Sequence, residues 1–447
     1  MSLLQPPERD HQPGRGPVRA APAGALPFTA PTRAALIGVI VCSAILSRFG
    51  VSIGEYSVSF SLFCQYAALA SLAASGQLRT DVPRAVLYAG LLLVAMLSWL
   101  FNMLISSPTS LLLLMTIYLP FAFSVSVRSD VGEQWRWMIG VFRSVALFCA
   151  VTGIIQFCAQ FVIHEPWLFD WTEFIPKPLR AMAGYNTAIP VGALFKSNGF
   201  FFREPSGFSQ FMAFGLICEM SLKERWSTAK FVRMGLFGFG LLLSYSGTGI
   251  LTLLIGMLFP LGRKTLLRVA ALAVAGVLVV TVLGEALNLS FTVGRIYEFS
   301  SDRSSGYSRF VAPVRLILEN LSGDPWTPFL GNGPGTITRV QTGYLKFDPT
   351  YAKSIFEYGL AGFFFVIGLV LYACNQFRSP AELRAALLAS YLIMGGHLLA
   401  PDETSLIYVL LGLWPHLPAL APSSRQHAQE SGHLPYGERV APHGSSG

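Results

Sequence analysis

Long apolar runs recur along almost the whole of this 447-residue chain and leave few folds open to it. Hydrophobic residues make up 53% of the sequence and charged residues only 13%. A run of about 20 apolar residues is long enough to cross the hydrocarbon core of a bilayer as a helix. In lipid, a helix satisfies all of its own backbone hydrogen bonds. The pattern therefore predicts an all-α, polytopic membrane protein.

We predict about twelve transmembrane helices, although eleven or thirteen would fit the same pattern. Together they form a single transmembrane domain over 34–420. Two of the spans are short and are separated only by a turn that begins at Ser246. The predicted spans are 34–49, 56–74, 85–103, 109–126, 144–163, 207–222, 231–245, 248–262, 269–288, 353–373, 383–400 and 404–419.

Lys and Arg residues fall in alternate loops, and this distribution predicts an orientation. With a cytoplasmic N-terminus, every inner loop carries Lys or Arg, whereas the short outer loops carry neither. Loops rich in Lys and Arg stay in the cytoplasm. We therefore expect both termini to be cytoplasmic, with 1–33 and 421–447 as disordered tails. The formal net charge of +8 then serves topology, and no nucleic-acid partner is expected.

Two segments, 164–203 and 289–350, are too long to be simple turns between spans. The predicted topology places both on the outer face, and they hold most of the charges that do not anchor spans. Long loops in compact proteins are usually functional. Apolar residues at helical spacing over 307–321 predict a short amphipathic helix, with Pro313 in its first turns. The glycine-rich turn at 330–336 would let backbone approach a ligand closely, but it lacks P-loop spacing.

Arg203 and Glu204 stand side by side where the span at 207–222 opens. Ionisable residues near the membrane interior are costly and are retained mainly where they bind a substrate or pair with each other. A local ion pair that anchors the span is the alternative interpretation. Arginine binds phosphate oxygens bidentately, so a lipid diphosphate at the outer interface is a fitting ligand.

Transfer of a group from such a diphosphate to a hydroxyl needs a base that takes the hydroxyl proton. Glu204 is the first candidate, and His164, Asp302 and Asp348 are alternatives that the sequence cannot rank. The chain has no Asp-x-Asp pair and no cluster of histidines and carboxylates with metal-ligand spacing. We therefore expect neither a metal nor a cofactor.

Four polar residues of the C-terminal half are assigned structural roles. Glu357 is expected to cap the N-terminus of a helix, where a carboxylate is favourable. His397 is expected to be a hydrogen-bonded packing residue inside a span. Asp402 and Glu403 are expected to be solvated turn residues.

Five motifs follow one another over residues 200–375 in the order of a known family. The chain resembles the O-antigen polymerase/O-antigen ligase superfamily, and most closely the Wzy-type exopolysaccharide polymerases. The motifs are the segment from Phe202 to Ser206, the serines and glycine at Ser244, Ser246 and Gly249, the serine-rich stretch from Ser304 to Arg309 followed by Arg315, the turn from Asp324 to Gly335, and the span opening from Phe356 to Gly362.

The resemblance implies a GT-C-like fold and a metal-independent, inverting glycosyltransferase. Such an enzyme joins undecaprenyl-diphosphate-linked repeat units at the outer face of the bacterial inner membrane, for exopolysaccharide or O-antigen (lipopolysaccharide) synthesis. The resemblance assigns acceptor activation to Glu204. It assigns diphosphate binding to Arg203, Arg295, Arg309 and Arg315. It assigns further substrate contacts to Ser206, Asn332 and Gly333. The implied partners are the lipid-linked oligosaccharide, membrane lipids, and a chain-length regulator and flippase of the same pathway.

Two other functions stay open. An O-antigen ligase or protein O-oligosaccharyltransferase would share the donor site, but ligases often carry a histidine in the second long loop, and 289–350 has none. A flippase for lipid-linked glycans would be a transporter, and transporters often show internal symmetry and charges near the membrane midplane. Here no repeat is visible and the charges gather in the two long loops. The sequence favours a polymerase.

Overall fold

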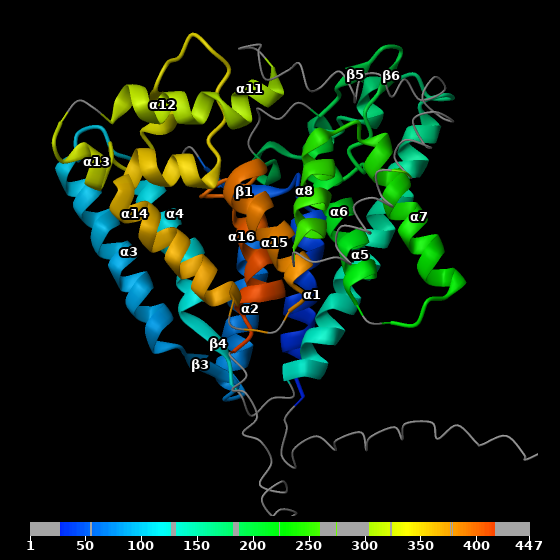
Figure 1. The fold of residues 1–447 in the computed structure, drawn as a ribbon, viewed down its shortest axis with the longest axis horizontal. Helices are drawn as coiled ribbons and strands as arrows, with labels where there is room; N and C mark the ends of the chain where they lie inside the picture. The colour runs from blue at the N-terminus through cyan, green and yellow to red at the C-terminus, as the bar shows by residue number, and fades with distance from the viewer. Residues whose placement is uncertain are drawn as a thin grey trace, which may run out of the picture.

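The computed structural model describes residues 27–53, 56–126, 131–181, 187–222, 224–259, 274, 304–321, 324–375, 377 and 379–415. Most of these residues form helices that run along one another in a bundle (Figure 1). The N-terminal half contributes α1 (Ala30–Ala44), α2 (Phe60–Ala74), α3 (Val82–Phe101), α4 (Pro108–Tyr118) and α5 (Val131–Ala159).

The second half adds three further helices to the bundle before a group of short ones. These are α6 (Pro205–Ser221), α7 (Thr228–Leu243) and α8 (Gly247–Leu258). The short helices are α11 (Ser305–Phe310), α12 (Ala312–Asn320) and α13 (Thr327–Leu330). The chain then returns through α14 (Thr350–Asn375), α15 (Ala381–Ala389) and α16 (Pro401–Ile407), with π-helical turns at Ser390–Met394 and Tyr408–Gly412.

Strands are few and form three short antiparallel pairs within the described residues. β1 (Gly50–Ile53) pairs with β2 (Tyr56–Ser59), β3 (Leu78–Thr80) with β4 (Phe123–Val125), and β5 (Pro190–Val191) with β6 (Leu194–Phe195). Polar residues in the connections start the helices. Ser59, Asp81 and Ser107 each accept a hydrogen bond from a backbone N–H in the first turn of the helix that follows.

The predicted membrane character is supported, but the count of twelve spans is not confirmed. Among the described helices, three are long and apolar enough to cross a membrane, namely α3, α5 and α14. Four shorter apolar helices cover Ala30–Ala44, Phe60–Ala74, Pro108–Ala122 and Gly247–Leu258. The predicted span at 269–288 lies outside the described residues apart from 274. The predicted span at 383–400 is too long, because the helix ends at Met394 and a turn follows.

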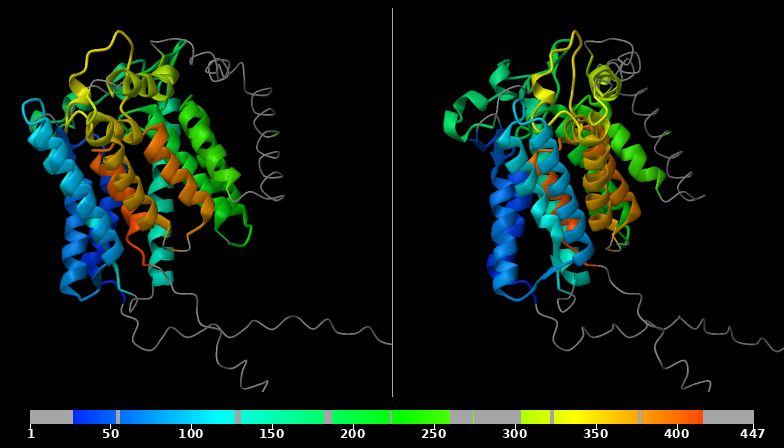
Figure 2. Two further views of the ribbon diagram at one scale, coloured as in Figure 1. Left: turned by 60° about the vertical axis from the view of Figure 1, so that its left-hand side comes forward. Right: turned by 90° about the vertical axis from the view of Figure 1, so that its left-hand side faces the viewer.

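The described parts of the two long segments lie at one end of the bundle. Figure 1 shows α11, α12 and α13 there together with β5 and β6, whereas β3 and β4 lie at the opposite end. Figure 2 shows the same arrangement from two other sides. We call this the loop end. The predicted single helix at 307–321 is instead two helices, α11 and α12, that meet at Val311. Pro313 lies in the first turn of α12, where its missing N–H breaks no helical hydrogen bond.

Candidate active site

A cavity near the loop end gathers residues from α6, α11, α16 and the turns beside them. Its empty volume is about 940 Å³, part of it open to the outside. Charged and polar side chains line the loop end of the cavity: Arg203, Glu204, Ser206, Arg309, His397, Asp402 and Glu403. Apolar side chains predominate in the remainder, which is lined by Phe211, Phe214, Leu387, Leu406 and Ile407 together with the polar Gln210, Ser390 and Tyr391.

The start of α6 places Glu204 in this cavity. Glu204 is the N-cap residue, with extended backbone, and Pro205 occupies the first helical position. The side chain of Glu204 makes no capping hydrogen bond, so the carboxylate is directed to other groups. Ser206 Oγ donates to its Oε2 at 2.8 Å. Phe214 lies ten residues further along α6, about 15 Å by the helical rise, which separates the apolar part of the cavity from the charged part.

Arg309 reaches the same carboxylate from α11. Its Nη2 donates to Glu204 Oε2 at 3.0 Å and to Ser206 Oγ at 3.3 Å. Its Nη1 donates to the carbonyl of Met394 at 3.2 Å, and the guanidinium lies 4.8 Å from the ring centroid of Phe347. The structure thus joins two predicted site residues that are 105 positions apart in the sequence.

Arg203 lies across the cavity in a second ion pair. Its Nε donates to the carbonyl of Ser47 at 2.6 Å, and its Nη2 lies 3.6 Å from Asp402 Oδ2. Asp402 is buried at the start of α16, so the prediction that it is a solvated turn residue is wrong. Glu403, half-buried, lines the cavity as well.

His397 is a residue of this cavity that the sequence interpretation left out of the site. It lies in the turn between the π-helical segment after α15 and the start of α16. Its Nδ1 is 3.1 Å from Asp348 Oδ1, and its backbone N–H donates to Glu403 Oε2 at 3.1 Å. The ring packs 4.5 Å from that of Phe347. Histidine and carboxylate therefore form a hydrogen-bonded pair at the cavity wall.

A buried lysine, Lys353, also contacts the Asp348 carboxylate of this pair. Lys353 Nζ lies 3.4 Å from Asp348 Oδ2 and 2.9 Å from Glu357 Oε1. Burial opposes ionisation of Asp348, but Lys353 and His397 outweigh it and hold the pKa of Asp348 well below its usual range. Glu357 lies within α14 and pairs with Lys353, so it does not have the expected role of capping a helix start.

Several predicted site residues lie away from the cavity. Arg315 is exposed, pairs with Glu319 at 2.6 Å and stacks over Tyr344. The backbone N–H groups of Asn332 and Gly333 donate to carbonyls of α14 instead of facing the cavity. The positive φ values of the glycine-rich turn thus serve close packing, of Gly331 against α14 and of Gly333 and Gly335 against the segment between α3 and α4. Arg295 and Asp302 lie outside the described residues.

The sequence held only weak signals for the missed residues. His397 precedes the adjacent acids Asp402 and Glu403 by five and six positions, and this grouping at the end of a span was the available cue. Its partner Asp348 is 49 positions away, so only the tertiary fold shows the pair. Within the described residues, no group of three or more His, Cys, Asp or Glu side chains lies close enough to hold a metal ion.

The fold and the cavity define a helical membrane protein with arginine–carboxylate pairs near its loop end. The sequence model of the WcaD colanic acid polymerase family matches residues 181–411, just over half of the chain. The chain therefore belongs to this family, and its predicted kinship with Wzy-type exopolysaccharide polymerases is confirmed. No curated protein matches it. The matched range includes Arg203, Glu204, Arg309 and His397, but not α1.

Proposed function

We propose that this protein polymerises a polysaccharide from lipid-linked repeat units at the outer face of the bacterial inner membrane. The growing chain would move from undecaprenyl diphosphate to the non-reducing end of the next lipid-linked repeat. The observation that carries this proposal is the two-part lining of the cavity. Arg203 and Arg309 stand at one end, and Phe211 and Phe214 stand further along α6. A diphosphate with an apolar tail matches both parts.

The two arginines supply what the leaving group needs. As the sugar–phosphate bond breaks, negative charge grows on the diphosphate, and fixed cationic donors stabilise that charge. Arginine is suited to this because its planar fork contacts two phosphate oxygens at once. Glu204 and Asp402, which pair with Arg309 and Arg203, orient them for this contact. The donor is thus bound by arginines that are already in place.

Glu204 and His397 are two groups of the cavity that could accept the acceptor's proton. Glu204 is the predicted base, but its Oε2 already accepts hydrogen bonds from Arg309 and Ser206, and a proton there would break the ion pair. His397 has its Nδ1 held by Asp348, which leaves Nε2 to accept a proton, as in hydrolase triads. We therefore propose His397 as the base and Glu204 as the residue that orients Arg309.

The reaction is then a single inverting displacement. The acceptor hydroxyl oxygen attacks the anomeric carbon of the donor sugar from the face opposite the diphosphate. The new carbon–oxygen bond forms as the carbon–phosphate-oxygen bond breaks, and the hydroxyl proton passes to His397 Nε2. The diphosphate leaves with both electrons of the broken bond, and Arg203 and Arg309 stabilise its charge.

The test is to profile undecaprenyl-linked glycans in cells whose own gene is deleted and replaced by variants. We expect His397→Gln and Arg309→Lys to accumulate single lipid-linked repeats at the outer leaflet. The matched control is His164→Gln, because His164 is exposed on the other long segment. Long polymers still attached to the lipid would mean a ligase. Single repeats trapped at the inner leaflet would mean a flippase, and either result would overturn the proposal.

The same cells assign the base. Glu204→Gln keeps the shape of the side chain and a hydrogen-bond acceptor, so we expect partial polymerisation with this variant. If His397→Gln polymerises normally and Glu204→Gln does not, the base is Glu204. His397 lies outside 289–350, so the absence of a histidine from the second long loop still favours a polymerase over a ligase. The family match also supports that distinction.

A further inference from the structure

We propose that Arg48 is a positioning residue that aims Arg203 into the cavity without touching the substrate. Arg48 lies in the turn after α1, outside the range that matches the family and outside the cavity lining. It acts together with Trp171 and Asn198, and we call these three residues the loop clamp. The inference rests on the proposed function of the cavity.

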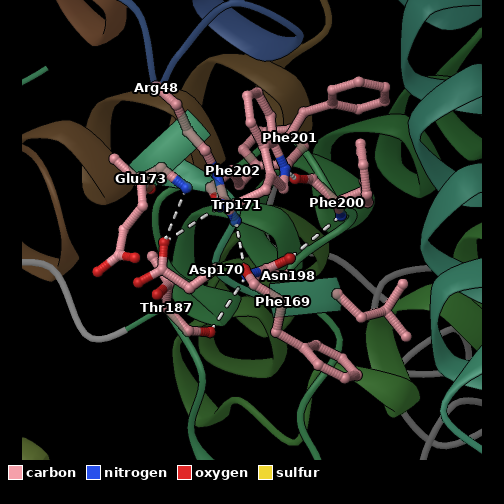
Figure 3. Close-up of polar contacts among 12 residues, drawn as sticks. Arg48, Phe169, Asp170, Trp171, Glu173, Thr187, Asn198, Phe200, Phe201 and Phe202 are labelled. Carbon is pink, nitrogen blue, oxygen red and sulfur yellow. Dashed lines mark hydrogen bonds and ion pairs between the residues drawn. The ribbon is translucent and has the colours of Figure 1, made fainter. Parts of the chain in front are cut away.

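Arg48 directs its donors to the backbone next to Arg203. Its side chain is 1% exposed. Nε and Nη2 both donate to the carbonyl of Phe202, at 3.2 and 2.9 Å, and Nη2 also donates to the carbonyl of Phe169 at 2.8 Å (Figure 3). Nη1 lies 3.6 Å from Asp170 Oδ1. A buried arginine is costly unless its donors are used. Here most of them hold the two ends of the first long segment together.

The backbone that Arg48 holds is strained. Gly199 has a φ of 67° and Phe200 a φ of 66°, a left-handed conformation that is unfavourable for a bulky residue. Such strain costs about 1–3 kcal/mol and persists only where several contacts enforce it. It is also concentrated at functional sites in general. The turn at 198–202 is therefore a place where backbone geometry is imposed by its surroundings.

The rest of the loop clamp supplies those contacts. Trp171 Nε1 donates to the carbonyl of Phe200 at 2.7 Å, and the two rings stack with centroids 5.5 Å apart (Figure 3). Asn198 Nδ2 donates to the carbonyls of Phe169 and Thr187, while its Oδ1 accepts from the Phe200 N–H at 3.1 Å. Gln156 Nε2 donates to Asn198 Oδ1 at 2.9 Å and ties the turn to α5.

The backbone that the loop clamp holds is adjacent to Arg203 in the chain. Phe202 precedes Arg203, so any shift of the Phe202 carbonyl shifts the Cα of Arg203 with it. Ser47, the neighbour of Arg48, accepts from Arg203 Nε at its carbonyl and donates from its Oγ to the Phe201 carbonyl at 2.8 Å. Two adjacent residues after α1 thus fix both the backbone and the side chain of Arg203. A misplacement of about 1 Å in a catalytic group can cost about 100-fold in rate.

Arg84 provides the matched control. It too is fully buried, and it donates to the carbonyls of Gly412, Trp414 and Ala373, at 2.5, 3.0 and 3.3 Å. It lies at the start of α3, next to β3 and so at the end of the bundle opposite the cavity (Figure 1). Lysine at either position keeps the charge but cannot reach several carbonyls with a planar fork. Loss of stability should therefore affect both variants, whereas loss of positioning should affect only Arg48→Lys.

The experiment measures polymerisation by purified full-length protein in lipid nanodiscs, with synthetic lipid-linked repeats, per amount of folded protein. Four variants are compared with the natural protein: R48K, R84K, R203K and the double variant R48K/R203K. We expect R48K to lower kcat about 100-fold and R84K to leave it within about threefold. Because Arg48 acts through Arg203, the double variant should be no slower than R203K alone.

Additive losses in the double variant, or equal losses in R48K and R84K, would overturn the inference. If R48K does not fold, Trp171→Phe replaces it, because phenylalanine keeps the ring stacking and removes only the donor to Phe200. The same non-additivity with R203K is expected. If R203K itself retains full activity, the proposed function of the cavity fails. If R203K is impaired and R48K is not, only the positioning role fails.

Discussion

Replacing Arg309 by lysine tests the donor site most directly. In the structure this guanidinium donates to Glu204, Ser206 and the carbonyl of Met394 and stacks over Phe347. Lysine keeps the positive charge but can no longer hold these partners and still present a second donor to the diphosphate. Removal of one preorganised donor to a developing negative charge costs about 2.7–4 kcal/mol of transition-state stabilisation. We therefore expect Arg309→Lys to lower kcat by about 100- to 1,000-fold.

The assay follows chain length on gels after reaction of purified variants with lipid-linked repeats in nanodiscs. Arg315→Lys is the control, because Arg315 belongs to the same long segment but is exposed and pairs with Glu319 outside the cavity. We expect this control to stay within about threefold of the natural protein. If Arg309→Lys retained more than a tenth of the natural kcat, or if the two variants fell equally, the assignment of the diphosphate to this cavity would be refuted.

Three further variants test other parts of the structure. The pKa of Asp348 lies below its usual range, so Asp348 stays ionised in mild acid and favours protonation of His397; Asp348→Asn should move the acidic limb of the rate–pH profile down by about one unit and lower the maximal rate. An unmoved limb would show that His397 is not the titrating base. Glu219 is fully buried between Arg143 and Arg233, at 2.9 and 2.6 Å. Its replacement by alanine leaves two arginines without their partner and should lower the free energy of unfolding in detergent by about 3 kcal/mol. A loss under about 1 kcal/mol would contradict this role of the ion pairs. Gly359 has a φ of 67°, and an added Cβ would lie 2.5 Å from Leu330 N. Gly359→Ala should therefore lower the free energy of unfolding by about 3 kcal/mol or more, measured by thermal unfolding. An unchanged unfolding midpoint would contradict the strained geometry.

The sequence predicted the features that depend on local pattern. Apolar runs indicated the helices, and the motif around Arg203 and Glu204 indicated the start of α6, where both residues line the cavity. The pairing of Glu204 with Arg309 was not predictable as a contact, although both were assigned to one site. The order of the family motifs along the chain assigned both residues to one site, and the fold places their side chains in contact.

What the sequence could not supply were the environments of single polar residues. A histidine near the end of an apolar run predicts equally a packing residue and a base, and only the approach of Asp348 from a distant loop distinguishes them. The glycine-rich turn shows a second ambiguity. Its glycines permit positive φ values, which fit both ligand binding and close packing, and here Gly333 packs so closely that an added Cβ would lie 2.7 Å from the Cβ of Asn102.

The pairing of both cavity arginines with carboxylates explains how a cationic site persists beside an apolar one. Two unpaired arginines near lipid would be costly and would attract any anion, whereas pairing with Glu204 and Asp402 offsets that cost. A bound diphosphate must then share the arginines with these carboxylates, so its charge alone adds little affinity. The apolar lining along α6 supplies the remaining attraction, because contact with an isoprenoid tail removes apolar surface from water. In the proposed mechanism, lipid attachment therefore selects the substrate, and the arginines act mainly on the transition state.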